Sequence, residues 1–265
     1  NMVIILKNTE DVTNYEVGMV LNVFSSGGAA RIGKTGETGD FTLDLIDRDA
    51  GTLTFTGQEY ASGSGGTIAA DDLIIAKGDR NLVVSGLEAW VPTAATVTAG
   101  IPALFGVTRT TDVTRLGGNR FDGSSLPIEE ALIGGAARVA REGGRPDHCF
   151  VDFATFSNLE KALGSKVVYS EAKARNVDIG FAGIDIRGPR GTIKVIPDQN
   201  CQPDVAWMLQ MDTWSLNTLG DAPMFLDLDG NRMLRESGDD AYEIRLGYYG
   251  NVACNAPGYN CRVAL

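Results

Sequence analysis

The feature that most constrains the fold is an apolar stripe at helical spacing, which begins just before the middle of the chain. Its members are Ile128, Leu132, Ala136 and Val139. Apolar residues that recur every three or four positions line one face of an α-helix, so residues 127–141 are predicted to form an amphipathic helix. Strand-like segments occur on both sides of this helix. The chain is therefore expected to fold as an α+β protein.

Residues that favour helix termini mark both ends of this helix. Ser124 or Ser125 is the expected N-cap, and Pro127 suits the first turn. Two glutamates follow near the positive end of the helix dipole, and Gly143-Gly144 ends the helix. A second helix is predicted over residues 154–163. Further strands are expected at residues 148–151, 184–186, 192–196, 206–210, 241–254 and 261–265.

The first 95 residues carry strand signals and no helical period. Residues 41–47 alternate between apolar and polar types, residues 47–51 read as a tight turn, and residues 52–56 as the returning strand. Other strands are expected at residues 1–6, 20–24 and 73–76, with a flexible glycine-rich loop at 61–66. These spacings favour a small barrel or sandwich of antiparallel strands. Residues 96–126, rich in Thr, Gly and Pro, are predicted to be an extended connector.

Charge argues against a protein that wraps nucleic acid tightly. The net charge is −11 and the pI about 4.6, whereas affinity for phosphates comes from Lys and Arg. No apolar run approaches the roughly 20 residues that cross a membrane. The chain starts at Asn1 without a signal peptide, and we expect it to begin partway through a longer protein.

The four cysteines predict neither a zinc site nor a secreted protein. They have no C-x-x-C spacing, and His148 is the only histidine. Reduced, buried thiols are expected, with a Cys254–Cys261 disulfide as the alternative. The four cysteines are Cys149, Cys201, Cys254 and Cys261.

Two motifs resemble functional sites but favour a structural interpretation. The run Asp227-Leu228-Asp229-Gly230 with Glu236 resembles a calcium loop, yet Phe225 occupies the position of the first acidic ligand, so a turn is expected. Asp147 is adjacent to His148, and neighbours in a strand point to opposite faces, so we expect no direct relay between them. A structural histidine at a strand edge is favoured.

The other polar motifs also lack the context of a reaction centre. Gly63, Gly65 and Gly66 precede no helix that opens with Lys and Ser or Thr, as a phosphate loop requires. Lys161 and Lys166 suit the negative end of the second helix. A basic cluster is expected on an exposed hairpin, with a phosphate contact as the alternative; it comprises Arg187, Arg190 and Lys194. Trp90 and Trp207 are expected in strands, and Trp214 follows one. No residue is assigned as catalytic, cofactor-binding or metal-binding.

The order of elements from Pro127 to the end resembles that of tailed-bacteriophage major capsid proteins of the Hong Kong 97 fold. The resemblance lies in the helix over 127–141, the segment from Gly143 to Asp152, the helix with Phe156-Ser157-Asn158-Leu159, the strands around 184–196, and the terminal run 240–258. Residues 15–92 resemble a β-rich insertion found in some of these proteins. The N-terminal arm, extended loop and long spine helix of this family have no counterpart here and are expected upstream of Asn1. No Lys–Asn crosslink is predicted.

This resemblance implies an α+β, Hong Kong 97-like capsid fold with axial and peripheral domains and a β-rich inserted subdomain. The expected divisions are a β-rich insertion with an adjoining peripheral strand over 1–95, the connector over 96–126, the axial domain over 127–220, and a return to the peripheral domain over 221–265. The implied function is structural, with no enzyme activity and no cofactor. The chain would form homo-pentamers and homo-hexamers of an icosahedral phage head that encloses double-stranded DNA without reading its sequence.

The resemblance also implies partners and a location. Besides copies of itself, the expected partners are scaffold, portal and decoration proteins, and no membrane. The protein would assemble in the host bacterial cytoplasm and reside in the virion. Two alternatives remain open from the residues: the shell protein of an encapsulin-type bacterial compartment, and a β-rich binding module fused to an α/β domain.

Overall fold

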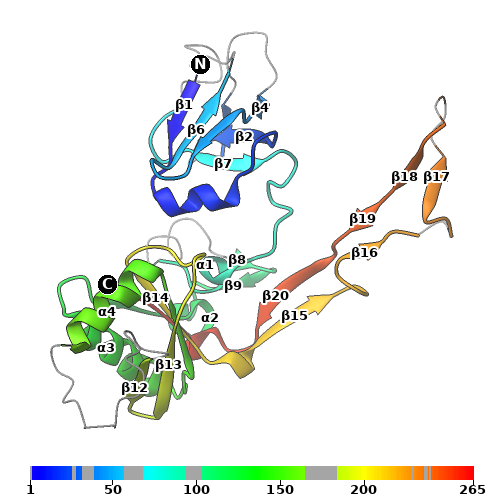
Figure 1. The fold of residues 1–265 in the computed structure, drawn as a ribbon. Coiled ribbons are helices and arrows are strands. Elements are labelled where there is room, and N and C mark those ends of the chain that lie inside the picture. The colour runs from blue at the N-terminus through cyan, green and yellow to red at the C-terminus, as the bar shows by residue number, and fades with distance from the viewer. Residues whose placement is uncertain are drawn as a thin grey trace, which may run out of the picture. The chain divides into compact units, whose positions relative to one another are not determined.

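The structure is a computed structural model that describes residues 2–25, 28–31, 39–56, 68–93, 103–164, 184–227, 230–235, 238 and 240–265. The chain forms two compact units, Asn1–Val83 and Val84–Leu265, which are taken separately below (Figure 1). The sequence placed its first division at residue 95. The domain limits expected from the sequence remain predictions.

In its described residues the first unit consists of two small antiparallel sheets. One has the order β1-β6-β5, and in the other β2 pairs with β3, β4 and β7. The elements are β1 (Met2–Ile5), the 3₁₀ helix η1 (Thr9–Asn14), β2 (Val20–Phe24), β3 (Ala30–Arg31), β4 (Phe41–Thr42), β5 (Leu45–Asp47), β6 (Thr52–Phe55) and β7 (Leu73–Ala76).

The core of the first unit consists of nine buried side chains contributed by both sheets and η1. Phe41 and Phe55 meet edge to face across it, with ring centroids 6.0 Å apart. Alternation along the strands explains these positions, because β6 buries every second residue. The core residues are Met2, Ile4, Val12, Leu21, Val23, Phe41, Leu43, Leu53 and Phe55.

Residues 41–47 do not form the single strand that their alternation predicted. Phe41 pairs with Leu21 in one sheet, whereas Leu45 pairs with Thr54 in the other. The chain changes sheets at Leu43, which is fully buried between them. After this corner the alternation shifts by one residue, because Leu45 is exposed and Ile46 packs on the core. The regular apolar–polar pattern of the sequence did not reveal the corner.

An ion pair joins β3 to the segment before β7 in the first unit. Arg31 donates from Nε and Nη2 to the two carboxylate oxygens of Asp72, each at 2.9 Å. Asp72 also accepts a hydrogen bond from the backbone N–H of Ala69 at 2.7 Å. These bonds, above all the one from Arg31, hold the pKa of Asp72 below its usual value.

A six-stranded mixed sheet organises the body of the second unit, with the order β10-β21-β14-β11-β13-β12. The pairs β10–β21 and β11–β13 are parallel, and the other neighbours are antiparallel. Its strands are β10 (Asn119–Asp122), β11 (His148–Val151), β12 (Ile184–Gly188), β13 (Gly191–Pro197), β14 (Val205–Leu209) and β21 (Cys261–Ala264). The strand expected at 261–265 thus lies inside this sheet, between β10 and β14.

Helices α3 (Ile128–Arg141) and α4 (Phe153–Gly164) cover one face of the sheet. The predicted stripe is confirmed, since Leu132, Ala136 and Val139 are buried against the strands. Gly135 lets α3 approach β21 closely, because a Cβ atom there would lie 2.5 Å from Cγ2 of Val263. The glycine therefore costs helix propensity but permits the contact between helix and sheet.

The caps of the two helices differ from one another. Asp152 caps α4, since its Oδ2 accepts hydrogen bonds from the backbone N–H groups of Ala154 and Thr155. The prediction of a serine cap on α3 is wrong. Pro127 is the N-cap residue there, without a side-chain bond. Ser124 donates its hydroxyl to Asp122 instead, at 2.7 Å, because the two residues share a tight turn.

Short elements precede α3 where the sequence predicted an extended connector. The described part of residues 96–126 contains β8 (Ala103–Leu104), β9 (Val107–Thr108), α2 (Val113–Gly117) and β10, and α1 (Leu87–Trp90) lies before it. Elements of two to five residues are too short to show a period, so they could not be predicted from the pattern of residues. Trp90 accordingly ends a helical turn and does not lie in a strand.

We call the six-stranded sheet with α3 and α4 the body of the second unit. In the sequence, the segment between β14 and β21 forms a long two-stranded antiparallel ribbon that extends from the body (Figure 1). We call it the arm, and it runs from Trp214 to Cys254. Its three ladders are β15–β20, β16–β19 and β17–β18. The strands are β15 (Trp214–Thr218), β16 (Met224–Phe225), β17 (Met233–Arg235), β18 (Tyr242–Ile244), β19 (Leu246–Gly247) and β20 (Gly250–Cys254), preceded by η3 (Met211–Thr213). The predicted strand over 241–254 is thus present in three pieces.

Candidate assembly surface

The outer part of the arm has two chemically different faces. Register places Met233 opposite Ile244, Arg235 opposite Tyr242, and Phe225 opposite Leu246. Because side chains alternate along a strand, residues 242, 244 and 246 share one face with their partners. We call this the apolar face of the arm, made of Phe225, Met233, Tyr242, Ile244 and Leu246.

All five side chains of the apolar face are open to solvent. Their exposed fractions run from 53% for Ile244 to 65% for Tyr242. The other face, which we call the polar face, exposes the ion pair of Arg245 and Glu243 at 3.0 Å, whereas its apolar side chains are partly buried. These apolar side chains are Met224, Leu226 and Leu234. A ribbon of two strands has no second layer to cover either face, so it is at most marginally stable alone in water. Large apolar groups gathered on one such face mark a surface for interaction.

A buried asparagine, Asn260, holds the base of the arm, where β15 begins and β20 ends. The side-chain oxygen of Asn260 accepts hydrogen bonds from the backbone N–H of Gln210 and from the indole N–H of Trp214, both at 2.9 Å. Its amide nitrogen donates to the carbonyl of Ala256 at 3.0 Å and to the hydroxyl of Thr213 at 3.2 Å. All four hydrogen-bonding positions of the amide are thereby used. Asn260 is fully buried, so the network fixes both strands of the arm where they enter the body.

The segment that contains α1 also contacts the base of the arm, at β20. Trp90 donates its indole N–H to the carbonyl of Val252 at 3.0 Å and packs edge to face on Trp214. The backbone N–H of Ser85 donates to the side chain of Asn251 at 2.8 Å. Residues far apart in the sequence therefore hold β20 in place.

Arginine side chains in turn hold the α1 segment. Arg109 is 1% exposed and donates to the carbonyls of Ala89 and Trp90, which lie at the C-terminal end of α1. Burial lowers the pKa of Arg109 from its ordinary value. Arg120 donates to the carbonyls of Pro92 and Gly117. Cations at a helix C-terminus complement its orphan carbonyls.

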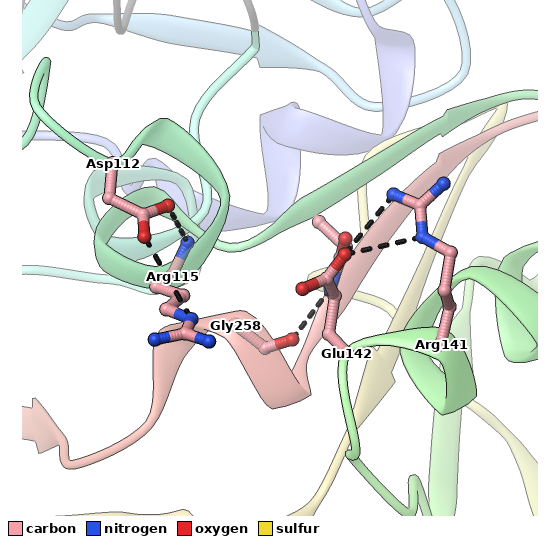
Figure 2. Close-up of polar contacts among 6 residues, drawn as sticks. Asp112, Arg115, Arg141, Glu142 and Gly258 are labelled. Carbon is pink, nitrogen blue, oxygen red and sulfur yellow. Dashed lines mark hydrogen bonds and ion pairs between the residues drawn. The ribbon is translucent and has the colours of Figure 1, made fainter.

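Figure 2 shows polar contacts of Gly258, which lies in the turn just before Asn260, and of Asp112 with Arg115, together with the Arg141–Glu142 pair. This turn, η4 (Pro257–Tyr259), packs against α2. The carbonyl of Gly258 accepts a hydrogen bond from the buried amide of Asn119 at 2.6 Å. Asp112 caps α2 by accepting from the backbone N–H of Arg115 at 3.1 Å. A Cβ atom at Gly258 would lie 3.1 Å from Cα of Arg115, so glycine permits this close packing.

The sheet face opposite α3 and α4 carries an apolar groove of about 540 Å³. Trp207 and Leu209 alternate with the core residues Ala206 and Met208, which places them on this second face. Arg262 lies over the ring of Trp207, 5.8 Å from its centroid. The apolar side chains that line the groove are Leu87, Phe150, Cys201, Trp207, Leu209 and Met211.

His148 and Asp147 are closer than the sequence predicted. Nδ1 of His148 lies 3.2 Å from Oδ1 of Asp147, although the geometry is not that of a hydrogen bond. The expectation that opposite faces would keep the two side chains apart was wrong: Asp147 lies just before β11, and the two side chains approach each other there. Asp147 accepts a hydrogen bond from the backbone N–H of Met211, and His148 stacks on Phe150. Both contacts fit the structural interpretation.

The remaining sequence candidates are dispersed over the fold. Arg187, Arg190 and Lys194 lie on the β12–β13 hairpin, where Arg190 donates to the carbonyl of Gly143. Lys161 lies in the last turn of α4, as predicted. Lys166, the glycine loop at 61–66, and the Asp229 and Glu236 of the calcium-like run lie outside the described residues.

The cysteines are free thiols, and three of them are buried. Burial raises the pKa of Cys201 to about 11 and that of Cys149 still further. Among the described residues, no three His, Cys, Asp or Glu side chains gather as a metal would require. None of the helices in the described ranges is long and apolar enough to cross a membrane.

The described structure is thus that of a subunit with an anchored arm whose outer part has an exposed apolar face. Residues 81–232 match the model of the family described as SU10 major capsid protein, which covers more than half of the chain. The chain therefore belongs to this family of phage major capsid proteins, the structural proteins of the virion shell. No curated protein matches the chain.

The family match confirms the resemblance to phage major capsid proteins that the order of elements indicated. It extends through α3, α4 and the six-stranded sheet as far as β14, and ends inside the arm just before β17. Residues 1–80 lie outside it. The sequence did not single out the apolar face of the arm or Asn260. The terminal run 240–254 did signal a strand, but its partner strands in residues 214–235 are too short and too broken to be recognised.

Proposed function

We propose that this chain assembles as pentamers and hexamers into the icosahedral head of a tailed bacteriophage that encloses double-stranded DNA. The observation that carries the proposal is the family match over residues 81–232, which includes α3, α4, five strands of the six-stranded sheet, and β15 and β16 of the arm. The fold proposed for the whole subunit is of the Hong Kong 97 type, with a mixed sheet, two covering helices and a long β-arm as its parts.

The body and the arm support distinct roles in such a shell. In the proposed division, the mixed sheet with α3 and α4 is the axial domain near the centre of each capsomer. The arm, which the Asn260 network fixes to the body, belongs to the peripheral domain. Repeated heterologous contacts of one subunit close into rings when the rotation between neighbours allows it, and permanent interfaces commonly bury about 2,000 Å² or more.

The first unit is proposed as the β-rich insertion, which braces neighbouring subunits or receives a decoration protein. It has a core of its own and an internal Arg31–Asp72 ion pair, so it is built to fold as a separate module. Deleting residues 1–83, the whole first unit, from the full-length protein tests the bracing role and leaves Ser85 and Trp90 in place. Unchanged assembly and shell stability would contradict that role.

The net charge of −11 supports a container that does not bind its contents tightly. Neutralising phosphates requires Lys and Arg, and the chain has 23 of these against 34 Asp and Glu. Scaffold and portal proteins are the proposed assembly partners in the host cytoplasm. The match to a phage family favours this proposal over a bacterial compartment shell.

Negative-stain electron microscopy of the full-length protein tests the proposal. The protein is expressed alone and together with a scaffold encoded beside its gene. Closed shells or ring-shaped capsomers are the expected result. Monomers that remain monodisperse at high concentration, even with the scaffold, would contradict it.

A further inference from the structure

We propose that the apolar face of the arm is a contact between copies of this chain, in which Ile244 and Leu246 dock on a neighbouring subunit. The inference rests on the proposed function for the identity of the partner. It starts from the register of the arm, which collects Phe225, Met233, Tyr242, Ile244 and Leu246 on one side. Each of the five is more than half exposed.

The free energy gained by burying these exposed apolar side chains indicates that a partner covers the face in the assembled protein. Burying one large apolar side chain fully lowers the free energy by about 1.5–3 kcal/mol. Burying five of them would therefore stabilise an association substantially. A two-stranded ribbon cannot bury such a face against itself. On the polar face the exposed groups are the Glu243–Arg245 ion pair, and the apolar side chains, such as Leu234, are already partly buried.

The size of the arm suits a contact between protein subunits. Stable protein interfaces engage about 20–30 residues on each side, which is the scale of the segment between Trp214 and Cys254. Apolar anchors surrounded by polar groups are the usual centre of such interfaces. Around this face the polar groups are Arg235, which lies opposite Tyr242, and Asp240, 3.7 Å from its guanidinium.

The chemistry of the face favours a protein partner over nucleic acid. Phosphate binding requires several cations, whereas Arg235 is the one charged member among the six paired positions on this face. In a family of major capsid proteins the abundant protein partner is another copy of the same chain. A second copy is therefore the occupant we assign.

The anchored base of the arm adds a mechanical reason for this assignment. Asn260 and Trp90 fix the first ladder of the arm to the body, so the exposed face is presented in a defined direction. A preorganised arm loses less conformational entropy on docking than one that must order at the contact. Rigid presentation is what repeated, identical contacts in a closed shell require.

Isotope-mixed photocrosslinking tests the identity of the partner. The full chain is made with p-benzoylphenylalanine at position 244, and ¹⁴N-labelled and ¹⁵N-labelled batches are mixed before assembly. Crosslinked peptides that join one light and one heavy chain are the expected result. The matched control carries the same probe at position 245, on the polar face, and should give several-fold fewer mixed crosslinks.

A pair of charge-matched variants tests the energetic role of the face. Ile244→Asp and Arg245→Gln each lower the net charge by one at adjacent positions on opposite faces. Ile244→Asp should raise the subunit concentration needed for half-maximal association, measured by sedimentation velocity, by about tenfold or more, and Arg245→Gln by less than about threefold. Ile244→Thr keeps a β-branched residue and should give an intermediate shift with an unchanged circular dichroism spectrum.

The outcomes separate this inference from the proposed function. Mixed crosslinks from position 244 in a protein that never forms shells or capsomers would support the arm contact and refute the capsid assembly. Normal shells with crosslinks only inside single chains, or no crosslinks, would refute the arm contact and leave the capsid function standing. Equal association of Ile244→Asp and Arg245→Gln would also refute it.

Discussion

Replacing Asn260 by alanine removes the group that joins the arm to the body, and the structure allows the cost to be worked out. The side chain is fully buried and bonds to the N–H of Gln210, the indole of Trp214 and the carbonyl of Ala256. Each buried polar group left without a partner costs about 1–3 kcal/mol. Three such groups, partly rehydrated by water in the new cavity, predict a loss of about 3–5 kcal/mol in the free energy of unfolding.

Equilibrium urea unfolding of the full chain, followed by the fluorescence of its three tryptophans, measures this loss. The matched control is Asn217→Ala, an exposed asparagine three residues into the arm, which should change stability by less than about 0.5 kcal/mol. Asn260→Asp keeps the acceptor oxygen but turns the donor into a second acceptor facing the carbonyl of Ala256, so it should also destabilise. A loss below about 1 kcal/mol for Asn260→Ala would refute the anchoring role.

Three further perturbations test other parts of the fold. Because the pKa of Asp72 is lowered in the folded state, its stabilising effect is complete above the unfolded value of about 3.9 and is lost as pH falls through the folded pKa. Asp72→Asn should therefore lower the melting temperature at pH 7 and flatten its fall in acid; an unchanged acid profile would contradict the Arg31 pairing. Gly135→Ala should lower the melting temperature despite the better helix propensity of alanine, because its Cβ would lie 2.5 Å from Val263; Ile133→Ala, on the exposed side of α3, is the control. In native protein at pH 8 a maleimide should leave Cys149 unmodified and react slowly with Cys201, whereas urea should expose all four thiols; rapid native labelling of Cys149 would contradict its burial.

Elements with a long period were predictable from the sequence. The stripe of α3 and the strand at His148–Val151 were placed correctly because each has several buried positions at a regular spacing. The cap of α3 was misassigned because Asp122 competes for the hydroxyl of Ser124, a local bond that residue type alone does not reveal.

The candidate surface was harder to predict, for a physical reason. The face of the arm is defined by cross-strand register, such as Met233 opposite Ile244, and register depends on which distant segments pair. Asn260 gave no signal either, since its importance comes from partners up to 50 residues away in the sequence. The family resemblance was recognisable because it depends on the order of elements and not on any single residue.

Electron cryomicroscopy of the particles that the full-length protein forms is the most direct test of the central claim, that this chain is the shell subunit of a phage head. The account predicts an icosahedral shell in which the body of α3, α4 and the six-stranded sheet repeats around fivefold and sixfold positions. A well-ordered map of closed particles in which this body does not form the shell, or a protein that forms no closed particles with or without its scaffold, would contradict it.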